Sequence, residues 1–180
     1  MTEAQRAVCD ESISGKRGKL PTPMIAWIRN PELARRAQHL GELLRFHTSL
    51  EPVLVELAIL VTARNLRSHQ VWTSHKRYAL QFGMSELNVH AIGHGLEPSW
   101  SSEREAIVYD VSHALAVDHR IGPELYAESV AVLGETATAE LVAVVGYYGL
   151  VGLTANAFEL GLPANEVPEF EDAVTGLADG

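Results

Sequence analysis

The sequence has very little cysteine, and it has no apolar stretch near its start. Its 180 residues include one cysteine, Cys9. An intrachain disulfide, a CxxC redox pair and an all-cysteine metal cage are therefore excluded within one chain. Residues 1–20 mix charges of both signs and lack the apolar core of a secretory signal, so we expect a cytoplasmic protein.

Basic residues are also few, and this excludes a second group of functions. The chain has 14 Lys and Arg against 23 Asp and Glu, a formal net charge of −9. A field of this sign repels phosphate backbones and anionic lipids, so we expect neither a nucleic-acid nor a membrane partner. The longest apolar run, residues 141–158, approaches the length of a membrane span. It contains polar side chains such as Tyr148 and Asn156 and three glycines, so we interpret it as a buried helix.

The sequence also lacks the pattern of β-strands. No segment alternates apolar and polar residues for more than a few positions. Apolar residues recur instead at helical spacing, and Asn30-Pro31-Glu32 carries the start signals of a helix. The fold class is therefore all-α. We expect helices over 31–47, 52–66, 68–82, 85–93, 102–118, 122–134 and 136–160.

The chain length fits one domain with a core of its own. Residues 1–22 are polar and end in a Pro-Thr-Pro stretch that cannot begin a regular helix, so we expect a flexible N-terminal arm there. A helical domain is expected over residues 23–165. Pro163 and Pro168 then mark the exit into an acidic C-terminal tail over residues 166–180.

Glu56 and His75 are the first candidates for chemistry. Glu56 lies inside the broad apolar band of the helix expected over 52–66. An unpaired ionised carboxylate there would cost several kcal/mol, so Glu56 needs a proton or a donor. His75 on the next helix can be that partner, giving a proton relay for general acid-base catalysis. A buried pair that only ties two helices together is the alternative.

The residues around this pair resemble a known family. Residues 55–61, the pair Trp72 and His75, and the turn at 83–85 resemble the carboxymuconolactone decarboxylase family, which shares its fold with alkylhydroperoxidase D-like proteins. The resemblance covers about residues 25–165 and implies a single-domain helical bundle of the alkylhydroperoxidase D-like type. Further matching segments are Arg104-Glu105-Ala106, Gly146-Tyr147-Tyr148 through Asn156-Ala157-Phe158, and Leu162-Pro163.

The peroxidase branch of this family has two cysteines between the glutamate and the histidine. Counting from Glu56 places those positions at Ser68 and Val71, with the histidine at His75. Peroxidase chemistry needs a thiolate, which neither residue supplies, so a thiol peroxidase is not expected. Val71 also stands where many relatives carry an acid just before the tryptophan.

The cysteine-free branch implies a decarboxylase-like C–C lyase that acts on a small carboxylated lactone or carbonyl acid without a metal or an organic cofactor. Loss of carbon dioxide leaves charge on the carbonyl and requires a proton at carbon. We expect His75 to carry that proton and Glu56 to orient it. The alternatives are an isomerase or hydrolase on the same scaffold, and a non-catalytic ligand-binding or assembly protein.

Five further residues are candidates for substrate binding. Ser68 and Gln70 lie near a helix start whose free amides favour an anion. Trp72 lies three positions before His75, so both can face one cavity. Tyr148 and Asn156 lie on one face of the last helix, since they are eight residues apart. Each also has a structural interpretation, as a cap, a solvated side chain, a core aromatic or a helix-packing group.

A metal site is the rival interpretation. Glu86, His90 and His94 lie at spacings of four and could share one helix face, and a looser set comprises Asp110, His113, Asp118 and His119. We expect no metal, because such histidines are usually surface residues. The expected partners are a small-molecule substrate and other copies of the same chain, because the resemblance implies a homo-oligomer (dimer, trimer or hexamer).

Overall fold

The computed structural model describes residues 1–16, 18–162 and 165–170, and within these ranges it contains helices and no strand. The expectation of an all-α fold is confirmed. The helices are α1 Glu3–Ser14, α2 Met24–Trp27, α3 Pro31–Phe46, α4 Pro52–Asn65, α5 His69–Gln81, α6 Glu86–His94, α7 Glu103–Val117, α8 Pro123–Leu133 and α9 Glu135–Ala157.

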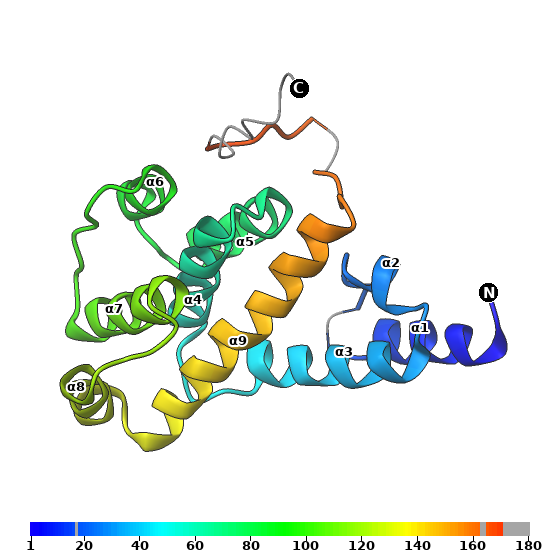
Figure 1. Ribbon diagram of the computed structural model, residues 1–180, viewed down its shortest axis with the longest axis horizontal. Coiled ribbons are helices and arrows are strands. Elements are labelled where there is room, and N and C mark those ends of the chain that lie inside the picture. The colour runs from blue at the N-terminus through cyan, green and yellow to red at the C-terminus, as the bar shows by residue number, and fades with distance from the viewer. Residues whose placement is uncertain (17, 163–164, 171–180) are drawn as a thin grey trace, which may run out of the picture.

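Helix α4 forms the centre of the bundle. Its residues Leu57 to Leu60 have no exposed surface, and α4 packs against α5, α7 and α9 (Figure 1). A helix that is apolar on all sides has to be enclosed, because no face of it can be left to water at low cost. Glu56, one residue before this enclosed stretch, is therefore placed in the protein interior.

Local capping sets several helix boundaries where the sequence predicted them. The Asn30 side chain accepts a hydrogen bond from the Leu33 amide at 3.2 Å, and Ser102 caps α7 by accepting from the Glu105 amide at 3.2 Å. Gly95 ends α6 in the left-handed conformation, with φ of 67°. Ser68 stands at the N-cap of α5 but makes no capping hydrogen bond.

The N-terminal segment differs from the flexible arm expected over residues 1–22. Residues 3–14 form α1, which opens with a reciprocal capping box between Thr2 and Gln5 and packs on α3. Val8 is fully buried there. The polar composition concealed this helix, because one narrow apolar stripe is enough to dock twelve residues. Of the tail expected over 166–180, residues 171–180 lie outside the described ranges.

Helix α9 is long and apolar enough to cross a membrane, by length and composition alone. Half of its most apolar stretch is buried inside the bundle, as the core helix of a globular fold would be. At Gly41, α3 approaches α9 so closely that an added Cβ would overlap the phenol of Tyr147. The absence of a side chain at Gly41 therefore permits this helix contact.

We predict opposite effects of two Gly→Ala substitutions on stability. Gly41→Ala should lower the free energy of unfolding by about 1–3 kcal/mol, because the new methyl group displaces a rigid aromatic ring. Gly146→Ala should raise it by roughly 0.5–1 kcal/mol, since its Cβ would meet nothing within 4 Å and alanine favours the helix. Denaturant unfolding of both variants measures the difference, and equal effects would contradict the proposed close approach.

Candidate active site

A buried carboxylate and a histidine are hydrogen-bonded at the centre of the candidate site. Glu56 is 1% exposed on α4, and its Oε2 lies 2.6 Å from Nδ1 of His75 on α5. An ionised carboxylate can only accept a hydrogen bond, so Nδ1 of His75 carries a proton and donates a hydrogen bond to Glu56. This contact fixes the orientation of the imidazole and leaves Nε2 as the nitrogen available to a bound molecule. The structure thus brings together the pair predicted from the sequence.

Arg45 supplies a second partner for Glu56 from the last turn of α3. Its Nη2 lies 3.6 Å from Glu56 Oε1, and its side chain is 8% exposed. Burial lowers the pKa of Arg45, but the Tyr148 phenol and the Glu56 carboxylate raise it by more, so the pKa lies above its usual value. The guanidinium therefore keeps its positive charge in the interior and balances the charge of Glu56.

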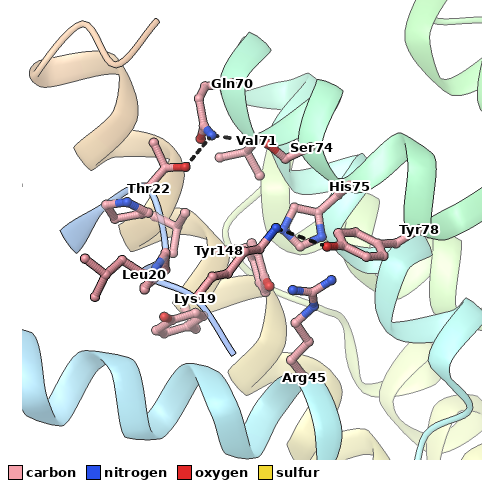
Figure 2. Close-up of a pocket in the computed structure, with 14 residues that line it drawn as sticks. Lys19, Leu20, Thr22, Arg45, Gln70, Val71, Ser74, His75, Tyr78 and Tyr148 are labelled. Carbon is pink, nitrogen blue, oxygen red and sulfur yellow. Dashed lines mark hydrogen bonds between the residues drawn. The ribbon is translucent and has the colours of Figure 1, made fainter. Parts of the chain in front are cut away.

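A cavity of about 300 Å³ lies on the other side of His75. Figure 2 shows His75, Tyr78, Tyr148 and Arg45 converging on it, and the segment that includes Lys19 and Thr22 closing one side. The full lining is Lys19, Leu20, Pro21, Thr22, Pro23, Arg45, Gln70, Val71, Ser74, His75, Tyr78, Tyr147, Tyr148 and Val151. Glu56 does not line the cavity, so it can act on a ligand only through His75 or Arg45.

Two of the five predicted substrate-binding residues line this cavity. The Tyr148 ring packs edge-on against His75, with 4.9 Å between ring centroids. Gln70 donates hydrogen bonds to Thr22 Oγ1 at 3.0 Å and to Ser74 Oγ at 3.2 Å. Gln70 thus ties α5 to the segment that closes the cavity.

The other three predicted residues do not line this cavity. Ser68 is fully buried, and its Oγ has no hydrogen-bond partner among the described residues. Trp72 lines a separate cavity with Leu80 and Val89, so the expectation that it shares one with His75 is wrong. Asn156 donates to the Leu66 carbonyl at 2.8 Å, which is the helix-packing role weighed for it. A three-residue spacing turns Trp72 about 60° around α5 from His75, which here directs it toward the cavity bordered by Val89 and His90 of α6.

Lys19, Arg45 and Tyr78 are among the cavity residues that sequence reasoning missed. A signal for Arg45 was available, because it continues the apolar stripe of α3 four residues after Gly41. For Tyr78 the signal was its position three residues after His75. Lys19 had no such signal, since the chain path of residues 18–23 depends on contacts distant in sequence.

The rival metal set does not form a cage. In the parts of the chain that the structure describes, no three His, Cys, Asp or Glu side chains are arranged to hold a metal ion. The rings of His90 and His94 stack on each other with 4.0 Å between centroids. Nδ1 of His94 forms a hydrogen bond with the His90 carbonyl oxygen at 2.9 Å.

Comparisons with known proteins show the fold. No protein-family model and no curated protein matches the sequence. Among solved structures, the chain is similar to a cysteine-to-alanine variant of the debrominase Bmp8 in complex with 2,3,4-tribromopyrrole. The TM-score is 0.66 and the identity 15%, over 90% of this chain and 85% of that chain. The expectation of an all-α, alkylhydroperoxidase D-like fold is thus confirmed. At this identity the likeness carries no activity to the present chain.

We predict that Glu56→Gln lowers the free energy of unfolding by about 3 kcal/mol, because it leaves the buried charge of Arg45 without its carboxylate. The double variant Glu56→Gln/Arg45→Met should lose less than the sum of the two single variants, since both charges are removed together.

The control for this experiment is Glu51→Gln, which breaks the exposed 2.8 Å ion pair between Glu51 and Arg104. It should change the free energy of unfolding by less than about 1 kcal/mol. Denaturant unfolding of all four variants gives these values. Strict additivity at Glu56 and Arg45 would show that the two charges do not depend on each other.

Proposed function

We propose that the protein is an enzyme that performs cofactor-independent acid-base chemistry on a small carboxylated lactone or carbonyl acid, with decarboxylation as its reaction. The observation that carries this proposal is the buried 2.6 Å contact between Glu56 and His75 at the wall of a cavity. A carboxylate behind an imidazole, with the ligand space in front, is the arrangement that a proton-transferring histidine needs.

The proposed reaction moves one electron pair and one proton. The bond between the carboxylate carbon and the ring carbon breaks, its electron pair is delocalised toward the substrate carbonyl, and carbon dioxide leaves. A proton from Nε2 of the His75 imidazolium then goes to the carbon. Glu56 stabilises the imidazolium through the Nδ1 contact, so its role is to orient His75 and support its positive charge.

The charges around the cavity support an anionic substrate. Arg45 and Lys19 both line it, whereas the carboxylate of Glu56 lies behind His75. A negatively charged molecule therefore meets two cationic side chains first. A volume of about 300 Å³ lies at the lower end of the range for small-molecule sites, which favours a substrate with one small ring.

The cavity wall also disfavours thiol chemistry. Val71 lines the cavity where the thiol branch would place its second cysteine, and Cys9 is buried in α1. Although the structural neighbour is a debrominase, the chain has no thiol at this wall with which to reduce a substrate.

The homo-oligomer implied by the resemblance is part of the same proposal. The outward face of α9 exposes Val142, Leu150 and Leu153, with Gly146 between them. Apolar side chains along one uncovered helix face are typical of a subunit contact.

We predict that His75→Gln lowers turnover by about 10²- to 10⁴-fold, because glutamine cannot carry a proton to carbon. The protein is incubated with a panel of carboxylated lactones and β-keto acids, and released carbon dioxide is measured. His94→Gln is the control, since His94 lies outside this cavity and should leave turnover unchanged. Conversion without carbon dioxide release would replace the lyase by an isomerase or hydrolase, and equal turnover by His75→Gln would contradict the acid-base role.

Cys9→Ser is predicted to keep the turnover of the native protein, because no proton or electron passes through this thiol. The same panel measures it, with a melting curve to confirm that the variant is folded. A loss of turnover in the folded variant would reintroduce a thiol mechanism.

A further inference from the structure

Tyr78 lies between two cationic side chains at the cavity wall. Lys19 Nζ donates to the Tyr78 hydroxyl at 3.5 Å, and the Arg45 guanidinium lies 4.2 Å from the centre of the Tyr78 ring (Figure 2). Lys19 comes from the segment before α2, Arg45 from α3 and Tyr78 from α5. Three parts of the chain thus meet at one tyrosine side chain beside the cavity.

The chemistry of these neighbours sets the direction of the Tyr78 proton. Ammonium and guanidinium groups only donate hydrogen bonds, whereas a phenol has one proton to donate and lone pairs that accept. Facing Lys19 and Arg45, the Tyr78 oxygen can only accept, so its own proton has no acceptor in either group. Because Tyr78 lines the cavity, that proton is available to a ligand oxygen.

The positive charges also make this hydroxyl a stronger donor. Burial raises the pKa of the Tyr78 phenol, but the hydrogen bond and charge of Arg45, followed by those of Lys19, lower it by more, so the pKa lies below its usual value. A more acidic donor forms a stronger hydrogen bond to an oxygen that gains negative charge.

We propose that Tyr78 binds the carbonyl oxygen of the substrate and that Lys19 is the positioning residue that directs its hydroxyl. This inference rests on the proposed function and names the residue that binds the carbonyl oxygen of its substrate. Tyr78 and His75 are one helical turn apart, with 6.0 Å between ring centroids. Tyr78 thus acts on the oxygen while His75 delivers the proton to carbon.

The step balances without a further reagent. The electron pair of the broken C–C bond reaches the carbonyl oxygen, where the Tyr78 hydrogen bond stabilises the enolate. His75 then gives its proton to the carbon, and the pair returns from oxygen. Tyr78 keeps its own proton throughout, so it is a hydrogen-bond donor to the transition state and not the acid that is consumed.

Two matched probes test the proposal without requiring turnover. The lactone 5-oxotetrahydrofuran-2-carboxylate and the ring ether tetrahydrofuran-2-carboxylate differ only in the carbonyl oxygen. Calorimetric titration of the native protein should give tighter binding of the lactone acid. Tyr78→Phe should weaken the lactone acid about five- to tenfold, as expected for one lost hydrogen bond, and leave the ether acid unchanged. Tyr126→Phe, an exposed tyrosine on α8, is the control and should change neither.

Lys19 is tested by the ionisation of Tyr78 itself. Tyrosinate absorbance is titrated in the native protein and in Tyr78→Phe, and the difference isolates Tyr78 among the five tyrosines. The charged groups that face it are Lys19, Arg45 and His75. Lys19→Met should raise the midpoint of this titration because it removes a cation, and Lys19→Arg should restore it.

The outcomes separate this proposal from the acid-base function. Equal weakening of both probes by Tyr78→Phe, no weakening of either, or no preference of the native protein for the lactone acid overturns the carbonyl-binding role. An unchanged titration midpoint in Lys19→Met overturns the role of Lys19. Failure of His75→Gln to reduce turnover would contradict the proposed function alone, because the binding comparison does not depend on His75 as an acid. Melting curves confirm that each variant is folded.

Discussion

The burial of one carboxylate constrains the rest of this structure. Glu56 lies on the most enclosed helix of the bundle, where an unpaired negative charge would cost several kcal/mol. His75 from α5 and Arg45 from α3 supply its partners, so three helices have to meet at a fixed geometry. The same contacts orient the imidazole toward the cavity. Stability and the proposed chemistry therefore depend on the same charge, and a change at Glu56 acts on both.

The fold could be predicted from the sequence because its signals are local. Caps such as Asn30 and the continuous apolar band of α4 act within a few residues of where they stand. The pairing of Glu56 with His75 was also predictable, since a glutamate in a fully apolar helix has to find a donor. Helix α1 was not, because its apolar stripe is narrow and becomes informative only once α3 is present to cover it.

The rest of the site depends on which side of α5 each residue faces and on contacts between residues that are distant in sequence. His75 and Val71 face one cavity, whereas Trp72 faces another, and a helical spacing of three did not distinguish these sides. The approach of Lys19 to Tyr78 joins residues 59 positions apart. No local pattern encodes such a meeting, which is set by the bond between Gln70 and Thr22 and by the path of the intervening chain. The fold shared with the debrominase Bmp8 leaves this wall free to differ between the two proteins.

The surroundings of Ser68 and Val71 have a consequence for redox engineering of this scaffold. Val71 borders the cavity one turn before His75, whereas Ser68 has no exposed surface and does not border it. A thiol introduced at position 71 would meet an incoming oxidant, but its partner at position 68 would be enclosed in protein. The three-residue spacing at the start of α5 is that of a CxxC pair, but Gly152 of α9 packs over position 68. Cysteines at both positions would therefore give a redox pair with one thiol bordering the cavity and the other shielded by α9, so a reagent would reach the pair only from the side of position 71.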